Sequence, residues 1–376
     1  MSTPATRYEQ VKETLRISSR KWLITGVGGF VGSHLLETLL NLNQKVVGVD
    51  NWSTGRKQNL ARVHSAVGDS LWRRFTLHSG DIRSPATCSK CVRRIDYVLH
   101  QAAIASVPLS FREPALCNAV NVDGFLNIFL AATDSKIRRI VYASSSAVYG
   151  DSPELPKREE SVGSPLSPYA VTKRVNELYA DVLAPLSGFA AIGLRYFNVF
   201  GPRQDPNGPY AAVIPQWVSS MLKNQKVTIN GDGKTTRDFC YIADVVQANL
   251  LAATADPFPF THRIYNVASG QESSLDQLFY SIRESLTEAE IEVQQSEPAY
   301  GPFRQGDIRH SHGDTSRIAL ELGYKPTRSL VEGISESLPC YQSIAGFGSG
   351  ASAERAASRT GRKAKNGRAP KRSRQR

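Results

Sequence analysis

Tyr169 and Lys173 lie four residues apart in the segment Tyr-Ala-Val-Thr-Lys. Residues at this spacing share one face of a helix, and Ser167-Pro168 just before them is typical of an N-cap followed by a first-turn proline. An unperturbed tyrosine has a pKa near ~10 and is a poor base at neutral pH. A nearby ammonium favours the phenolate, so the pair could serve as a general base. Taken alone, the same pair would also suit a solvated helix face.

A run of hydroxyls supplies a partner for this base. Ser144, Ser145 and Ser146 follow an apolar segment that predicts a strand at 140–143. Such serines often belong to turns, but here they would project from the carboxyl edge of a parallel sheet, where ligands bind. Together with Tyr169 and Lys173 they suggest one reaction: a serine hydrogen-bonds a substrate hydroxyl, the tyrosinate removes its proton, and the carbon gives up a hydride.

The hydride needs an acceptor, and a glycine-rich turn predicts one. Gly26, Gly29 and Gly32 follow a short apolar strand and open a helix, and Asp50 ends the next strand. This context is typical of dinucleotide binding, because the helix N-terminus offers free N–H groups to a pyrophosphate. An acid at Asp50 favours NAD over NADP. Further residues expected at the cofactor are Phe30, Val31, Asn51, Ser53, Gly55, Asp81, Ile82, Gln101, Ala102 and Ala103.

The elements that must position these residues alternate along the chain. Apolar periodicity predicts strands at 22–25, 46–50, 75–78, 97–101, 140–143 and 191–195. It predicts helices at 8–16, 32–41, 85–94, 114–133 and 168–184. Short, continuously apolar strands that alternate with helices indicate an α/β fold, a Rossmann-type doubly wound parallel sheet.

After Asn198 the alternation loosens, which predicts a smaller C-terminal substrate-binding lobe. We expect a helix at 213–223, a strand at 227–229 and helices at 272–287 and 314–338, while segments 238–253 and 264–267 rejoin the sheet. The predicted domains are therefore 1–197 with 238–268 for NAD, and 198–237 with 269–340 for a nucleotide sugar. Residues 341–376 form a predicted disordered basic tail.

Composition excludes several other functions. The apolar and charged fractions of 41% and 21% are those of a soluble globular protein. Residues 341–376 hold ten basic residues and one acid, so removing them cuts the net charge from +12 to +3, and a nucleic-acid role would rest on the tail alone. The five cysteines predict neither a disulfide scaffold nor a metal site. With no signal-peptide core and no expected membrane span, a cytoplasmic location is predicted.

The glycine turn, Asp50, the serine run and the Tyr169/Lys173 pair follow one another along the chain as in the extended short-chain dehydrogenase/reductase superfamily. Within that superfamily, the sequence resembles the NAD-dependent nucleotide-sugar epimerases. The resemblance runs from about residue 8 to 340 and makes Ser145 the active-site serine, beside Tyr169 and Lys173. Two further motifs, 194–202 and 231–239, also match. The resemblance implies that the nucleotide diphosphate of a UDP-sugar contacts Asn198, Arg237 and Arg304, with Asp307 at its ribose.

Five parts of the sequence are similar to bacterial UDP-N-acetylglucosamine 4-epimerases that serve surface polysaccharide synthesis: 46–51, 100–108, 165–180, 203–208 with 210–215, and 306–311. This likeness implies that Ser106, Ser145 and Ser146 line the sugar pocket, and that Ala212 and Val213 lie at the substrate. Ser311 aligns with a bulky tyrosine in epimerases restricted to non-acetylated sugars, so its small side chain leaves room for a 2-N-acetyl group. Ala147 departs from the subgroup, which often has a third hydroxyl there.

The sequence also bears on alternative reactions and alternative sugars. A 4,6-dehydratase normally has an Asp-Glu pair where this chain has Ser146-Ala147, so that activity is disfavoured. The sequence leaves open UDP-glucose or the corresponding UDP-uronic acid as the sugar, and it also leaves open a catalytically silent NAD-binding protein.

Members of the superfamily usually form homodimers through a four-helix bundle, which helices 114–133 and 168–184 would supply here.

Overall fold

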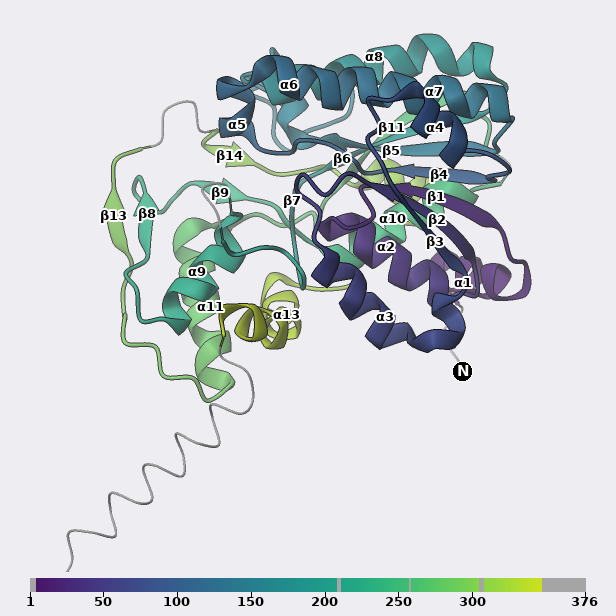
Figure 1. Ribbon diagram of the computed structural model, residues 1–376. Coiled ribbons are helices and arrows are strands. Elements are labelled where there is room, and N and C mark those ends of the chain that lie inside the picture. The colour runs from purple at the N-terminus through teal and green to yellow at the C-terminus, as the bar shows by residue number, and fades with distance from the viewer. Residues whose placement is uncertain (1–4, 208–210, 257, 304–307, 347–376) are drawn as a thin grey trace, which may run out of the picture.

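The structure is a computed structural model that describes residues 5–207, 211–256, 258–303 and 308–346. Its centre is a seven-stranded sheet in the order β11-β6-β5-β4-β1-β2-β3, with every neighbouring pair parallel (Figure 1). The strands are β1 (Lys21–Thr25), β2 (Lys45–Asp50), β3 (Phe75–Ser79), β4 (Tyr97–His100), β5 (Arg139–Ser145), β6 (Ala190–Tyr196) and β11 (His262–Val267). The predicted Rossmann-type fold is confirmed.

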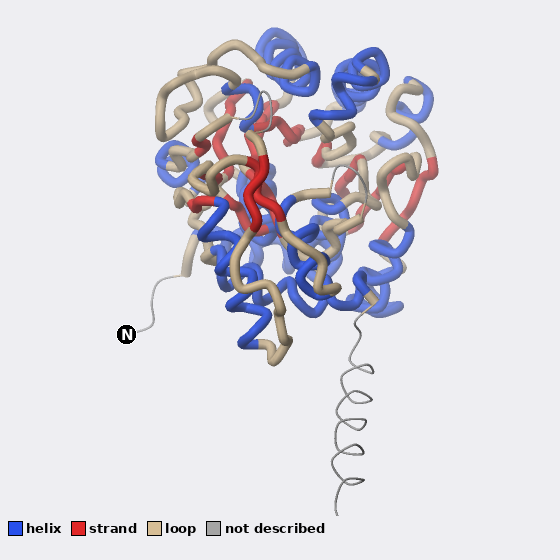
Figure 2. Tube along the Cα trace, turned by 90° about the vertical axis from the view of Figure 1, so that its left-hand side faces the viewer, coloured by secondary structure: helices blue, strands red, loops and turns tan. Residues whose placement is uncertain are grey.

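Helices cover both faces of this sheet (Figures 1 and 2). One face carries α1 (Arg7–Ile17), α2 (Phe30–Asn41), α3 (Lys57–Trp72) and α10 (Ile242–Thr254). The other carries α4 (Pro85–Cys91), α7 (Gly124–Ser135) and α8 (Pro168–Ser187). Trp22, Leu23 and Ile24 of β1 are fully buried, because a central parallel strand must bury both of its faces.

The predicted helix 114–133 is three elements rather than one. It consists of α6 (Pro114–Asn118), a π-helical turn at Ala119–Asp123, and α7. Such turns are rare and often mark functional sites; this one presents Asn121 to Ile104 and Thr172. Within the described residues, Pro114–Ser135 is also the one segment long and apolar enough to cross a membrane, contrary to our expectation that none is. Half of its apolar window is buried, as in a core helix of a soluble protein.

Three small sheets flank the central one. They pair β7 (Asn198–Phe200) with β10 (Phe239–Tyr241), β8 (Thr228–Asn230) with β13 (Ala299–Gly301), and β9 (Thr236–Arg237) with both β12 (Ser273–Ser274) and β14 (His310–Ser311). Around them pack α9 (Val213–Leu222) and α11 (Leu275–Glu288). Strand β11 rejoins the central sheet as predicted, whereas β10 pairs only with β7. The division into two domains stays a prediction.

The C-terminal elements differ from the prediction at two points. The expected helix 314–338 is divided into α12 (Ser316–Leu322) and α13 (Leu330–Ala345). The tail was expected to begin at residue 341, but α13 continues to Ala345 because Tyr341 is buried and donates a hydrogen bond to the Gly201 carbonyl at 2.9 Å. Residues 347–376, which hold the rest of the expected tail, lie outside the described residues.

Candidate active site

A cavity of about 1230 Å³ opens along the carboxyl ends of the central strands. Most of the residues expected at the cofactor, the base and the substrate line it: Gly26, Gly29, Phe30, Val31, Gly32, Asp50, Asn51, Ser53, Gly55, Ile82, Gln101, Ala102, Ala103, Ser145, Ser146, Tyr169, Lys173, Asn198, Arg237 and Ser311. Segments far apart in the sequence therefore meet at one site, as expected for the carboxyl edge of a doubly wound sheet.

Four other expected residues do not line this cavity. Ser106 is the N-cap of α5 (Val107–Arg112) and accepts a hydrogen bond from the Leu109 N–H at 3.1 Å. Asp81 forms an ion pair with Arg83 and accepts from Asn51. Ala212 and Val213 begin α9, away from the cavity wall. Arg304 and Asp307 lie outside the described residues.

The glycine turn after β1 is sterically required. Gly26 has φ +69°, and a Cβ there would lie 2.9 Å from the backbone N and Cα of Ala102. At Gly32 a Cβ would lie 2.2 Å from the Gly26 carbonyl oxygen. The turn thus lets α2 begin against β1, and its first residues Phe30, Val31 and Gly32 line the cavity. The N–H groups of the first turn of a helix lack internal partners and suit a pyrophosphate.

Asp50 ends β2 beside this turn. Its carboxylate accepts hydrogen bonds from the Gly28 N–H at 2.9 Å and from the Trp52 N–H at 2.8 Å. These bonds fix the side chain, and each oxygen keeps a second lone pair that can accept from a ribose hydroxyl. Gly55 passes so close that a Cβ there would lie 2.6 Å from an Asp50 oxygen. The glycine turn and Asp50 therefore fit the phosphates and ribose of NAD.

Helix α8 presents the proposed base. Ser167 caps it by accepting from the Ala170 N–H at 3.1 Å, as predicted from the sequence. Ser110 of α5, which sequence reasoning missed, accepts from the Tyr169 N–H at 3.0 Å. Because the first N–H groups of a helix lack internal partners, these two serines determine where the first turn of α8 lies. No sequence pattern signals Ser110, since the contact joins residues 59 positions apart.

Tyr169, Lys173 and Ser145 lie together at the cavity. Tyr169 is 8% exposed and lies within hydrogen-bonding reach of Ser145. The Ser145 hydroxyl also accepts from the Ala147 N–H at 3.1 Å. Burial raises the pKa of Tyr169 above its usual value, and the hydrogen bond with Ser145 opposes that rise. That Lys173 lowers this pKa stays a prediction.

Lys173 has an unusual environment for a cation. It is 3% exposed, and its Nζ donates to the Ala143 carbonyl at 2.7 Å and lies 6.0 Å from the Tyr169 ring centre. Burial lowers the pKa of Lys173 to about 8, although Cys117 and Glu177 favour the charged form. Perturbed groups of this kind are concentrated at functional sites.

Two polar clusters beside the cavity were not anticipated. Asn121 bonds Ile104 and Thr172, and so connects the π-helical turn to α8. Tyr196 donates to Gln101 at 3.1 Å, Gln101 donates to Asn249 at 3.1 Å, and Asn249 donates to Tyr196 at 2.8 Å. This closed ring orients the Gln101 amide at the cavity. Asn121 and Asn249 each lie within an apolar helical segment, and this pattern could have indicated a buried amide that needs hydrogen-bond partners.

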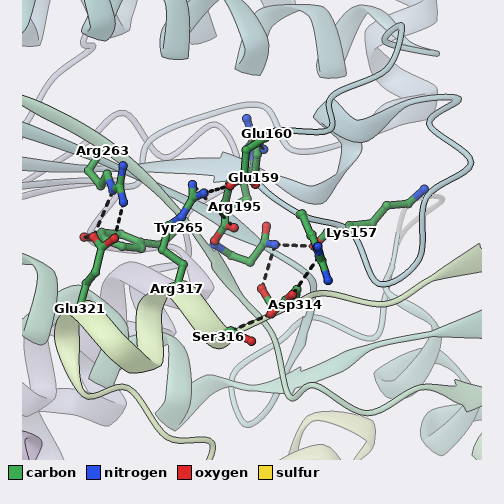
Figure 3. Close-up of polar contacts among 12 residues, drawn as sticks. Lys157, Glu159, Glu160, Arg195, Arg263, Tyr265, Asp314, Ser316, Arg317 and Glu321 are labelled. Carbon is green, nitrogen blue, oxygen red and sulfur yellow. Dashed lines mark hydrogen bonds and ion pairs between the residues drawn. The ribbon is translucent and has the colours of Figure 1, made fainter.

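The far wall comes from the small sheets. Ser311 and Arg237 are register partners across β14 and β9, and both line the cavity. Asn198 begins β7 and donates to the Asp238 carbonyl at 3.0 Å. Residues 157–160 contact the segment after Ser311. The Lys157 N–H donates to the His312 carbonyl at 2.7 Å, and the Asp314 N–H donates to the Lys157 carbonyl at 2.9 Å. Figure 3 shows Lys157 beside Asp314.

Among the residues that the structure describes, no group of three His, Cys, Asp or Glu side chains could hold a metal ion. The cavity can instead hold a dinucleotide on α2 and a second ligand between Ser145, Tyr169 and the wall formed by Arg237 and Ser311. A serine hydroxyl next to a buried phenol and ammonium, beside such a cofactor, suits proton removal coupled to hydride transfer.

Comparisons with known proteins agree with this geometry. Residues 22–268 match the NAD dependent epimerase/dehydratase family. A putative UDP-glucose 4-epimerase from Methanocaldococcus jannaschii is 37% identical over 314 residues, 83% of this chain and 95% of that protein.

Two solved structures are also similar. A UDP-N-acetylglucosamine 4-epimerase from Methanobrevibacter ruminantium, in complex with UDP-N-acetylmuramic acid, is 35% identical with a TM-score of 0.78, covering 87% of this chain and 99% of the other. A UDP-glucuronic acid 4-epimerase from Bacillus cereus, in complex with UDP-glucuronic acid and NAD, is 28% identical with a TM-score of 0.77, covering 86% and 99%.

Proposed function

Because the chain belongs to the NAD dependent epimerase/dehydratase family, we propose that it is a UDP-sugar 4-epimerase that works with tightly bound NAD. One observation carries the proposal: Ser145, Tyr169 and Lys173 share a single cavity with the glycine turn and Asp50. Relatives named as 4-epimerases extend over most of the chain, which supports the same reaction.

In this proposal the residues divide the work of inverting C4. Ser145 hydrogen-bonds the 4-hydroxyl, Tyr169 takes its proton, and Lys173 favours the phenolate. The glycine turn and Asp50 would hold NAD, which would supply the hydride acceptor and donor for C4. Asn198 and Arg237 hold the diphosphate, for which the planar Arg fork is well suited. Because the diphosphate anchors the substrate, the 4-keto sugar can turn over and take hydride on its other face.

We propose UDP-N-acetylglucosamine as the substrate and UDP-N-acetylgalactosamine as the product. Ser311 lines the cavity beside Arg237 and is small, which supports space for a 2-N-acetyl group. The relatives named for UDP-glucose and UDP-glucuronic acid make those sugars the competing candidates. The product would serve surface polysaccharide synthesis in the cytoplasm.

We also propose that the protein forms a homodimer. Helix α8 exposes an apolar stripe of Val171, Leu178, Val182 and Leu186, and Val182 and Leu186 are 67% and 81% exposed. Leu130 of α7, a helix in contact with α8, is exposed as well. A contiguous apolar patch on a helix pair is typical of a protein interface, and two copies would form a four-helix bundle.

The test is turnover of four substrates by purified protein, followed by NMR: UDP-GlcNAc, UDP-glucose and the two corresponding uronic acids. We expect C4 inversion, fastest with UDP-GlcNAc, and no net change in NAD redox state. Inversion of only another sugar would reject the proposed substrate but keep the reaction. If NAD copurifies and none of the four sugars is inverted, the protein is a silent NAD-binding protein instead.

A further inference from the structure

Glu177 lies one helical turn beyond Lys173 on α8 and is 1% exposed. Both of its carboxylate oxygens are fully used. Oε1 accepts from the Ser144 hydroxyl at 2.6 Å and from Arg195 Nε at 2.8 Å. Oε2 accepts from Arg195 Nη2 at 2.8 Å and from Arg174 Nη1 at 2.9 Å. A buried carboxylate with four donors holds those donors in one arrangement.

One of these donors belongs to the catalytic end of β5. Three consecutive residues there are held by three side chains that follow one another along α8. Ser145 lies within reach of Tyr169, the Ala143 carbonyl accepts from Lys173, and the Ser144 hydroxyl donates to Glu177. Two of these contacts involve groups that take part in the proposed reaction. Glu177 makes the third contact and touches neither the cavity nor the reacting atoms.

The second donor, Arg195, leads to the substrate wall. Its Nη1 donates to the Glu159 carbonyl at 2.9 Å, and Figure 3 shows Arg195 beside this residue. The Glu159 carboxylate accepts from the Asn266 N–H at 2.9 Å. Segment 157–160 in turn binds His312 and Asp314, next to Ser311. A chain of direct contacts therefore joins Glu177 to the wall that carries Ser311.

Glu177 also acts on Lys173 through its charge. The titratable groups that face Lys173 are Tyr169, Glu177, Cys117 of α6 and His100 of β4. Burial raises the pKa of Cys117 and lowers that of His100 to about 3, so both are neutral near pH 7. Burial also raises the pKa of Tyr169, so Glu177 is the ionised neighbour that favours a charged Lys173.

We infer that Glu177 is a positioning residue of the active site, which holds the serine end of β5 against α8 and keeps Lys173 charged. The inference rests on the proposed epimerase function. Arg195 serves it by holding the buried carboxylate in place and linking it to segment 157–160. A merely structural ion pair would contribute stability without influencing the titration of Lys173.

The test is Glu177→Gln in the full chain with NAD bound. We expect kcat to fall by about 100-fold, because a shift of about 1 Å at reacting groups has effects of that size. We also expect the alkaline limb of the kcat/KM–pH profile to move to lower pH, because Lys173 loses its ionised neighbour. Unchanged kcat and an unchanged limb, in a folded variant, would overturn the inference.

Two further variants distinguish a positioning role of Glu177 from a general loss of stability. Ser144→Ala leaves the Glu177–Arg195 pair intact and removes only the contact with β5, so it should fold and lose roughly 10-fold in kcat. If Glu177→Gln does not fold, full activity in Ser144→Ala would refute the inference. The matched control is Glu321→Gln: Glu321 pairs with Arg263 and accepts from Tyr265, away from the cavity (Figure 3).

Glu321→Gln should lower the thermal midpoint while kcat and the pH profile stay unchanged. An equal loss of kcat in this control would mean that any lost ion pair impairs the enzyme, and would reject a special role for Glu177. Wild-type protein is assayed in parallel. No C4 inversion by wild type refutes the proposed function, whereas active wild type with an equally active Glu177→Gln refutes the positioning role alone.

Discussion

At the scale of single residues, the proposed base lies in a setting that opposes its own ionisation. Burial raises the pKa of Tyr169 and lowers that of Lys173 to about 8, so near pH 7 the phenol is neutral while most of the lysine remains an ammonium. A phenolate therefore needs additional positive charge, which the oxidised nicotinamide ring can provide. This arrangement links proton removal to the presence of the hydride acceptor.

The most direct consequence concerns the phenol. Tyr169→Phe removes the hydroxyl and leaves the ring that packs in the cavity, so we expect kcat to fall on the order of 10³-fold. NAD should remain bound, because the glycine turn and Asp50 are untouched. NMR of the products and NAD content after denaturation measure the two effects. Turnover close to wild type would exclude Tyr169 as the base.

The pH dependence follows from Lys173. Its pKa is lowered to about 8, so the ammonium is present below that pH and is lost as pH rises through it. Since the phenolate depends on this charge, kcat/KM should decline above pH about 8 rather than follow the usual lysine pKa near ~10.4. A pH profile measured from 6 to 10.5 at constant ionic strength checks this. A plateau that persists beyond pH 10 would contradict it.

Selection of the sugar is expected to depend on Ser311. Ser311→Tyr fills the space proposed for the 2-N-acetyl group, so kcat/KM for UDP-GlcNAc should fall by about 100-fold, as for other steric exclusions in pockets. The value for UDP-glucose should stay within about threefold. Competition between the two sugars in one reaction gives the ratio directly. Equal losses on both would remove Ser311 as the determinant.

At the scale of elements, helix starts organise the site. The N-terminus of α2 faces the cavity at the glycine turn, and the N-terminus of α8 carries Tyr169 into it. Each start depends on a close local contact: Gly32 against the Gly26 carbonyl in α2, and Ser110 on the Tyr169 N–H in α8. Changes at these contacts should therefore affect ligand binding before they affect the core.

Gly32→Ala tests the α2 start. A Cβ would meet the Gly26 carbonyl oxygen at 2.2 Å, so the turn must shift, at a cost of about 1–3 kcal/mol in unfolding free energy. Copurified NAD should fall to a small fraction of the wild-type content. Gly346→Ala is the control, because no atom lies within 4 Å of a Cβ at Gly346; the positive φ there should cost only about 1 kcal/mol, and the variant should keep its NAD. Full NAD content in Gly32→Ala would contradict this account of the turn.

These elements also show what the sequence could reveal. The strands of the central sheet and the start of α8 were predictable, because buried parallel strands are continuously apolar and Ser-Pro marks an N-cap. The π-helical turn at Asn121 was not, since an inserted residue leaves the apolar pattern of 114–133 nearly unchanged. Ser110 and Glu177 act through contacts between segments distant in the sequence, for which one chain carries no local signal.

At the scale of the whole molecule, the cofactor wall, the base and the substrate wall come from different parts of the chain. The central sheet supplies Gly26 and Asp50, α8 supplies Tyr169, and the small sheets supply Arg237 and Ser311. Helix α8 faces the cavity with Tyr169 and Lys173, and solvent with the stripe that begins at Val171. One helix would then serve both the site and a subunit interface, so dimerisation would brace the helix that carries the base.

The stripe makes the dimer testable. Val182→Glu with Leu186→Glu places two charges on the proposed interface, and charges buried without partners oppose association. We expect light scattering to show a dimer for wild type and a monomer for this variant. Neither substituted residue lines the cavity. Leu320→Glu is the matched control, since Leu320 on α12 is 87% exposed outside the stripe, and it should stay dimeric. If the monomer also loses kcat while retaining NAD, the interface braces α8 as expected; a dimeric Val182→Glu/Leu186→Glu variant would place the interface elsewhere.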